Sequence, residues 1–234
     1  MANTFKFGNK QWYGKKGSVL AYNDENNNFK PLPFDFTRSS SATRVNSNGL
    51  IEVVGSDEPR VDYLNNADGH LLLEPQRTNY VTYSEDFSKG WGATGCSVIS
   101  NSITSPNGSQ NATKLVEDTS TGLHFLSLAN LYVVGAGNDN YLTIYAKEGE
   151  RRYLAISSRG NFSNNDNTLI FDTRDGVWTN NSSAQNTGED AIYMGDGWWR
   201  INILNSSVSA AYDGFGVGIA NGADDYTYAS YTGS

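Results

Sequence analysis

The chain has 234 residues, of which 25 are acidic and 17 basic, giving a formal net charge of −8. A protein that binds nucleic acid non-specifically needs the opposite balance, because phosphate contacts require basic side chains; no nucleic-acid partner is expected. The single cysteine, Cys96, excludes an internal disulfide and a zinc site built on cysteines. No apolar stretch reaches the length of a membrane-spanning helix, so membrane insertion is not expected.

Residues 1–36 are polar, with scattered aromatic side chains, and predict an irregular N-terminal arm that lies on another surface. Residues 37–79 alternate short extended runs with turns, which predicts a small β unit. Within it, Asn48-Gly49 stands between two apolar runs and predicts a β-hairpin.

Four arginines of the first 79 residues alternate with acidic residues. They predict salt bridges that fix the small β unit, and the alternative is a surface that docks another subunit. These arginines are Arg38, Arg44, Arg60 and Arg77.

Residues 80–234 consist of short segments that alternate apolar and polar side chains, separated by turns rich in Asn, Gly and Asp. This spacing is typical of an antiparallel β-sandwich or barrel. The core is expected to draw on the apolar positions of these segments. These positions are Leu115, Val116, Leu126, Leu142, Ile144, Tyr145, Leu154, Ile156, Leu169, Phe171, Ile192, Ile201, Ile203, Phe215 and Val217.

Two stretches carry a resemblance to bacteriophage virion proteins of the tail-fibre, head-fibre and receptor-binding kinds. The first comprises FDFTRSSSATRVNSNGLIEVVGSDEPRVDY and LLLEPQRTNYVTYSEDFSKGW. The downstream pieces NATKLVEDTSTGLHF, LTIYAKEGERRYLAI, TLIFDTRDGVW and GDGWWRINI resemble the jelly-roll carbohydrate-binding modules of families 4, 9 and 22. The resemblance covers about residues 34–234.

This resemblance implies an all-β fold in which an antiparallel jelly-roll sandwich follows the small β unit and the polar arm. In relatives, a run like the closing YTYASYTGS precedes one more strand, so the sandwich at 80–234 is expected to lack its last strand. Either the chain is a fragment of a longer fibre, or that strand is replaced. The exposed strand edge would then be covered by another segment or subunit, which points to a homo-oligomer, a trimer in a fibre.

The function implied is a non-catalytic protein of the virion surface that adheres to bacterial surface polysaccharide and contacts other virion subunits. The alternatives are a capsid-decoration or fibre-anchoring protein without a glycan ligand, and an accessory module of a polysaccharide-degrading enzyme. No catalytic residues are expected. His124 and Cys96 are interpreted as a hydrogen-bonded strand residue and a small packed residue.

Sugar binding needs aromatic faces for the C–H bonds of the ring and polar side chains for its hydroxyls. The aromatic candidates are Trp178, Tyr153, Tyr141, Tyr193 and Trp91. Packing is the alternative role for each of them. Trp198 and Trp199 are adjacent on a strand-like run and point to opposite faces; one is expected to be buried.

The related jelly rolls often hold a structural calcium ion near the ends of the sandwich. Calcium takes six to eight oxygen ligands from loops. The candidate ligands here are Glu85, Asp86 and Asp224. The alternative is that these carboxylates belong to solvated turns.

Overall fold

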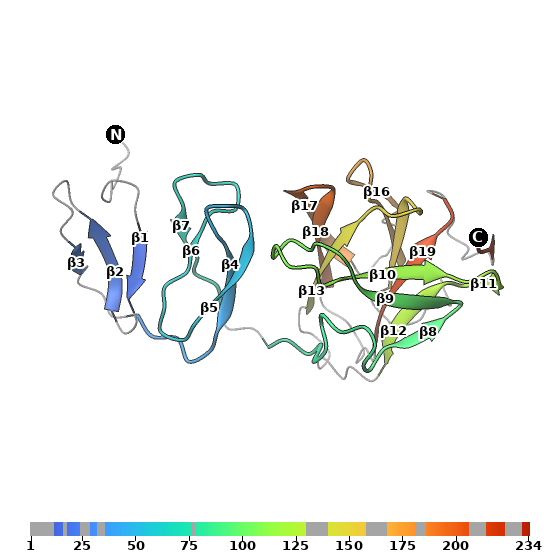
Figure 1. Cartoon of the computed structure of the whole chain (residues 1–234), viewed down its shortest axis with the longest axis horizontal. Helices are drawn as coiled ribbons and strands as arrows, with labels where there is room; N and C mark the ends of the chain where they lie inside the picture. Colours follow the sequence, from blue (N-terminus) through green and yellow to red (C-terminus); the bar gives the residue numbers. More distant parts are fainter. Residues whose placement is uncertain are drawn as a thin grey trace. The chain divides into compact units, whose positions relative to one another are not determined.

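The computed structural model describes residues 12–15, 18–23, 29–31, 36–75, 78–129, 140–157, 168–180, 186–205, 214–222 and 231–234. Within these ranges every regular element is a strand, and the strands pair antiparallel (Figure 1). The all-β class predicted from the sequence is therefore confirmed. The described part of the chain contains no helix that is long and apolar enough to cross a membrane.

The described residues divide between two compact units, which are residues 1–77 with 106–108 and residues 78–105 with 109–234. The predicted boundaries after residues 36 and 79 stay predictions. Where an irregular arm is predicted, the first unit contains a three-stranded sheet of β1 (Trp12–Lys15), β2 (Ser18–Asn23) and β3 (Phe29–Pro31).

The first unit also contains the predicted hairpin, formed by β4 (Ala42–Val45) and β5 (Ile51–Val54). Gly49 has a φ of +78°, a conformation that glycine adopts without steric cost. The Asn46 side chain accepts hydrogen bonds from the backbone N–H groups of Asn48 and Leu50. The turn chemistry read from Asn48-Gly49 is thus what closes the hairpin.

Buried charged side chains tie this hairpin to β6 (Val61–Asp62), which pairs with β7 (His70–Leu71). The Asp62 carboxylate accepts from the Val45 N–H at 2.8 Å. Arg60 bonds the Thr43 carbonyl and pairs with Glu74 at 2.7 Å. The salt-bridge interpretation fits Arg60 and also Arg44, which pairs with Glu52; Arg77 lies outside the described residues.

The second unit is a β-sandwich. Its larger sheet has the order β16-β15-β14-β19-β12-β8, and its smaller sheet has the order β13-β18-β17. The larger sheet consists of β8 (Gly92–Thr94), β12 (Phe125–Ala129), β14 (Tyr153–Ser157), β15 (Thr168–Asp172), β16 (Val177–Asn180) and β19 (Gly214–Ala220). The smaller sheet consists of β13 (Asn140–Lys147), β17 (Asn186–Gly195) and β18 (Trp198–Asn205). The jelly-roll connectivity stays a prediction.

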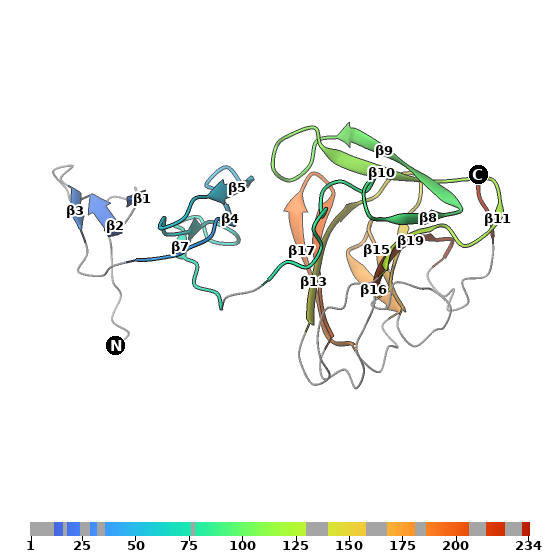
Figure 2. The same ribbon diagram turned by 90° about the horizontal axis from the view of Figure 1, so that it is seen from below.

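Two further strand pairs complete the second unit. The β9 (Cys96–Ile103) and β10 (Ala112–Glu117) hairpin lies along one side of the sandwich (Figure 2). The short strand β20 (Tyr231–Thr232) pairs with β11 (Thr121–Gly122), which places the C-terminus beside β11 (Figures 1 and 2). The last described residues are therefore paired within the chain.

The core lies between the two sheets. Ile156, Leu169 and Phe171 of the larger sheet are almost completely buried against Ile201 and Ile203 of the smaller sheet. Alternation along these strands puts every second side chain on this inner face. Burying such side chains contributes about 1.5–3 kcal/mol each to folding.

The predicted core residue Tyr145 is placed on the other face. Tyr145 is 38% exposed, whereas its neighbour Ala146 is buried in the core and Ile144 packs against it. Neighbours in a strand point to opposite faces, so Ile144 and Tyr145 cannot both be core residues, and the prediction for Tyr145 is wrong.

Candidate functional site: a pocket at three turns

Three turns of the second unit, two of them within β-hairpins and one joining the two sheets, meet around a pocket of about 310 Å³. They are the turn after β13, the turn between β15 and β16, and the turn between β17 and β18. The pocket is lined by Lys147, Glu148, Gly149, Thr173, Arg174, Tyr193, Gly197 and Trp199.

One wall of the pocket is aromatic. The rings of Tyr193 and Trp199 lie 5.1 Å apart between centroids, because β17 and β18 pair these two residues directly. The Trp199 indole N–H donates to the Thr173 carbonyl at 2.9 Å, and the ring packs edge-on to Phe171 at 5.9 Å. Trp199 is thus fixed by the core, while Tyr193 is 55% exposed and presents its ring to solvent.

Two glycines set the positions of these rings. A Cβ atom at Gly176 would lie 2.1 Å from Cη2 of Trp199, so the indole packs directly on the backbone of the β15–β16 turn. Gly197, in the β17–β18 turn, donates its backbone N–H to the Tyr193 hydroxyl at 3.1 Å. Both glycines have positive φ, +69° and +80°, a conformation that is strained for other residues.

The charged part of the lining, here called the charged wall, consists of Lys147, Glu148 and Arg174. The Arg174 guanidinium donates to both carboxylate oxygens of Glu148, from Nε at 3.1 and 3.2 Å. This carboxylate raises the pKa of Arg174, so the guanidinium stays protonated. The Lys147 side chain runs along Gly197, where a Cβ atom would lie 3.4 Å from its Cε.

The turn that carries Thr173 and Arg174 is held by a buried carboxylate. Asp172 accepts from Arg152 Nε at 2.8 and 2.9 Å, and from the backbone N–H groups of Arg174 and Asp175. The hydrogen bonds from Arg152 lower the pKa of Asp172. The ion pair between Asp172 and Arg152 therefore fixes the turn that carries Arg174.

The structure brings one of the five predicted aromatic residues into this pocket. Tyr193 lines it, whereas Trp178 packs against Phe171, with 5.0 Å between ring centroids. Phe171 also contacts Trp199. Trp178 therefore contacts a core residue that packs against the pocket, but it does not line the pocket itself.

The other three predicted aromatic residues lie elsewhere. Tyr153 packs beside a small buried cluster with Ala155, and Arg152 lies over its ring at 5.4 Å. Tyr141 is 53% exposed at the start of β13. Trp91 packs between Phe87 and Phe215, at 5.0 and 5.7 Å. A sugar-binding role for these residues stays a prediction.

Sequence reasoning omitted the charged wall, Lys147, Glu148 and Arg174, and did not choose between Trp198 and Trp199. The structure turns Trp199 toward the core, while the Trp198 indole N–H donates to the Thr104 carbonyl at 3.2 Å. The sequence feature that could have indicated this pocket is the glycine in each of its three turns, Gly149, Gly176 and Gly197.

Of the three proposed calcium ligands, the structure describes Glu85 and Asp86. Asp86 Oδ1 accepts the backbone N–H of Ser88 at 3.1 Å, and Oδ2 pairs with Lys89 at 3.0 Å. Both oxygens thus face donors, which suits a solvated turn better than a cation. Asp224 lies outside the described residues, and the residues that are described contain no group of three His, Cys, Asp or Glu side chains placed to hold a metal ion. The calcium ion stays a prediction.

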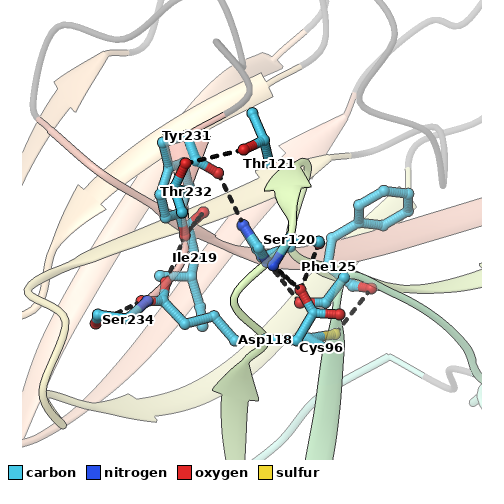
Figure 3. Close-up of polar contacts among 12 residues, drawn as sticks. Cys96, Asp118, Ser120, Thr121, Phe125, Ile219, Tyr231, Thr232 and Ser234 are labelled. Atoms are coloured by element: carbon cyan, nitrogen blue, oxygen red, sulfur yellow. Dashed lines mark hydrogen bonds and ion pairs between the residues drawn. The ribbon is translucent and has the colours of Figure 1, made fainter.

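A second polar cluster lies where β20 meets β11 (Figure 3). The buried ring of His124 has Nδ1 against the Gly95 carbonyl and Nε2 against the Tyr231 carbonyl at 3.3 Å. The Cys96 thiol donates to the Phe125 carbonyl at 3.2 Å, and burial raises its pKa. A nucleophilic thiol needs the reverse shift, so these contacts favour the role of fastening the C-terminal strand.

Comparison of the chain with models of protein families finds no match, and comparison with curated proteins finds none either. The resemblance to phage virion proteins and carbohydrate-binding modules therefore depends on the sequence segments that carry it. The assignment of a binding role depends on the geometry of the pocket.

Proposed function

We propose that this protein is a non-catalytic virion protein of a bacteriophage that adheres to bacterial surface polysaccharide, and that the pocket between the three turns is its sugar-binding site. The observation that carries this proposal is the exposed Tyr193 ring, which packs on Trp199 and lines the same pocket as the charged groups of Glu148 and Arg174. The resemblance of the sequence to carbohydrate-binding modules supports the same function.

The pocket combines the two kinds of contact that sugar recognition requires. The apolar C–H face of a pyranose packs on an aromatic ring, and its hydroxyls hydrogen-bond to carboxylate, guanidinium and ammonium groups. Tyr193 supplies the ring; Glu148 and Arg174, which already hold each other, supply acceptors and donors of fixed orientation. Preorganised groups lose little conformational freedom on binding, which favours affinity.

One shallow site of this kind binds a sugar weakly. Display of several copies on a trimeric fibre raises the overall avidity by ~10²–10⁴ when the sites can engage one polysaccharide together. A homotrimer on the virion surface, in contact with other virion subunits, is therefore part of the proposal.

The test is binding of the full chain to a panel of bacterial polysaccharides, measured on an immobilised-glycan array and then by titration calorimetry. The Tyr193→Ala variant removes the exposed ring, and Tyr80→Ala removes another exposed tyrosine that does not line the pocket. We expect Tyr193→Ala to weaken binding by at least tenfold and Tyr80→Ala to leave it unchanged.

Two outcomes would contradict the proposal. If no polysaccharide binds even to the multimer, a capsid-decoration or anchoring role without a glycan ligand is favoured. If both tyrosine variants bind as the wild type does, the glycan is held elsewhere on the chain. Mass measurement by light scattering establishes which oligomer is being tested.

A further inference from the structure

The charge of the pocket is opposite in sign to that of the whole protein. Three ionisable side chains other than tyrosine line it, namely the two cations Lys147 and Arg174 and the single carboxylate of Glu148. At neutral pH these sum to one positive charge, whereas the whole chain has a formal net charge of −8. A negatively charged protein with a locally positive pocket attracts anions to that pocket selectively.

The pairing within the wall identifies Lys147 as the cation that a ligand would meet. Glu148 is engaged by Arg174 through the Nε contacts to both of its oxygens. Among the ion pairs of the described residues, none includes Lys147. Its positive charge is therefore not balanced by a carboxylate of the pocket wall.

The position of Lys147 suits a group attached to a sugar that stacks on Tyr193. Its aliphatic stem lies against Gly197, and the N–H of Gly197 bonds the hydroxyl of Tyr193. The stem of Lys147, at the end of β13, and the ring of Tyr193, on β17, thus both lie beside the turn that contains Gly197. Asp196 belongs to this turn as well, but it is exposed and does not line the pocket.

We infer that the pocket is specific for an anionic sugar residue, such as a uronic acid, whose negative group faces Lys147 while its ring packs on Tyr193. This inference rests on the proposed function and adds the class of sugar to it. Lys147 is the residue that sets specificity, since Arg174 is already held by Glu148. A lysine acts here as a flexible point charge, so carboxylate and phosphate groups are both acceptable to it.

The experiment compares sugars that differ in charge alone. The probes are galacturonate oligomers, the same oligomers as methyl esters, neutral galactose oligomers, and galactose 6-phosphate against galactose, each titrated into the full chain by calorimetry. We expect the free acid to bind about five- to tenfold more tightly than its methyl ester at low salt, as one screened charge pair allows. The advantage should shrink as salt is added.

The variants separate charge from structure. Lys147→Gln should abolish the preference for the acid over the ester, and Lys147→Arg should keep it. Lys89→Gln, which removes an exposed lysine outside the pocket, should bind as the wild type does. A phosphate preference without a carboxylate preference would narrow the ligand to phosphorylated sugars.

The two proposals fail in different ways. If acid, ester and neutral oligomers bind equally well and Tyr193→Ala still abolishes binding, the pocket binds sugars but the inference about charge is wrong. If Lys147→Gln keeps the full preference for the acid over the ester, Lys147 does not determine the specificity for anionic sugars. If no probe and no polysaccharide binds, both the inference and the proposed function are overturned.

Discussion

The hydroxyl of Tyr231 donates a hydrogen bond to the carboxylate of Glu117 at 2.8 Å, although 114 positions separate the two residues. The same carboxylate accepts from Arg151 Nε at 3.0 Å and from the backbone N–H of Ser234 at 2.9 Å. Its side chain is only 6% exposed. One carboxylate at the end of β10 thus holds the C-terminal residues against the sandwich.

This relationship predicts that acid weakens the attachment of the C-terminus. Burial acts to raise the pKa of Glu117, but the hydrogen bonds from Arg151, Ser234 and Tyr231 outweigh it and lower the pKa from 4.5 to about 2. A lowered pKa means that the stabilisation is present above the unfolded value of 4.5 and is lost as the pH falls toward 2.

The Glu117→Gln variant tests this attachment. It removes the charge from several hydrogen bonds, so we expect unfolding to become easier by about 2 kcal/mol near neutral pH, a fall of roughly 4–8 °C in Tm. Thermal unfolding followed by circular dichroism should show this difference shrinking as the pH is lowered to about 2. Equal melting temperatures near neutral pH would contradict the prediction.

The two aromatic residues of the pocket should differ sharply in their effect on stability. Trp199 packs against Phe171 in the core, so Trp199→Ala should cost about 3–5 kcal/mol. Tyr193 is exposed and contacts mainly Trp199 and the turn, so Tyr193→Ala should cost less than about 1 kcal/mol. Chemical denaturation of both variants measures the difference; equal losses would mean that Tyr193 is a packing residue.

The close contact between Gly176 and Trp199 gives a third prediction. An alanine at position 176 would place its Cβ 2.1 Å from the indole and would sit at a φ of +69°. We expect Gly176→Ala to destabilise by about 1–3 kcal/mol and to change the tryptophan fluorescence. Gly149→Ala is the matched control, because nothing lies within 4 Å of its Cβ position, and it should be nearly neutral.

The parts of this fold that follow from local chemistry could be predicted from the sequence. Asn48-Gly49 specified its own hairpin, since the turn needs a positive φ at Gly49. The alternation around Ile201 and Ile203 specified an inner face, and both are buried. Tyr145 shows that apolar character alone does not predict burial. It follows Ile144, which packs against the core, so its side chain points to the other face of the strand.

The pocket could not be predicted in the same way, because its residues come from three separate turns. Glu148, Arg174 and Gly197 are brought together by the packing of the two sheets, and the glycines of the turns do not show that these turns meet. The pairing of Tyr193 with Trp199 depends on the β17–β18 register, and that register shifts between Tyr193 and Gly195. A one-residue shift exchanges the faces of a strand, so the sequence could not decide between Trp198 and Trp199.

The last prediction concerns the ion pair between Arg152 and Asp172, whose loss should affect both folding stability and sugar binding. Asp172 is 2% exposed and accepts from Arg152 and from the backbone of the turn that carries Arg174. Replacing this carboxylate by an amide removes the charge from these hydrogen bonds, and a hydrogen bond to a charged group contributes about 1.5–3 kcal/mol. We therefore expect Asp172→Asn to cost about 3 kcal/mol and to weaken sugar binding by loosening the turn.

Asp175 provides the control for this prediction within the same turn. Its carboxylate also pairs with Arg152, but its side chain is 58% exposed, and exposed pairs contribute only about 0–1 kcal/mol. Asp175→Asn should therefore leave both the unfolding free energy and the affinity for polysaccharide nearly unchanged. Equal effects of the two variants would show that the turn is not held by the buried carboxylate, and that the charged wall of the pocket owes its position to other contacts.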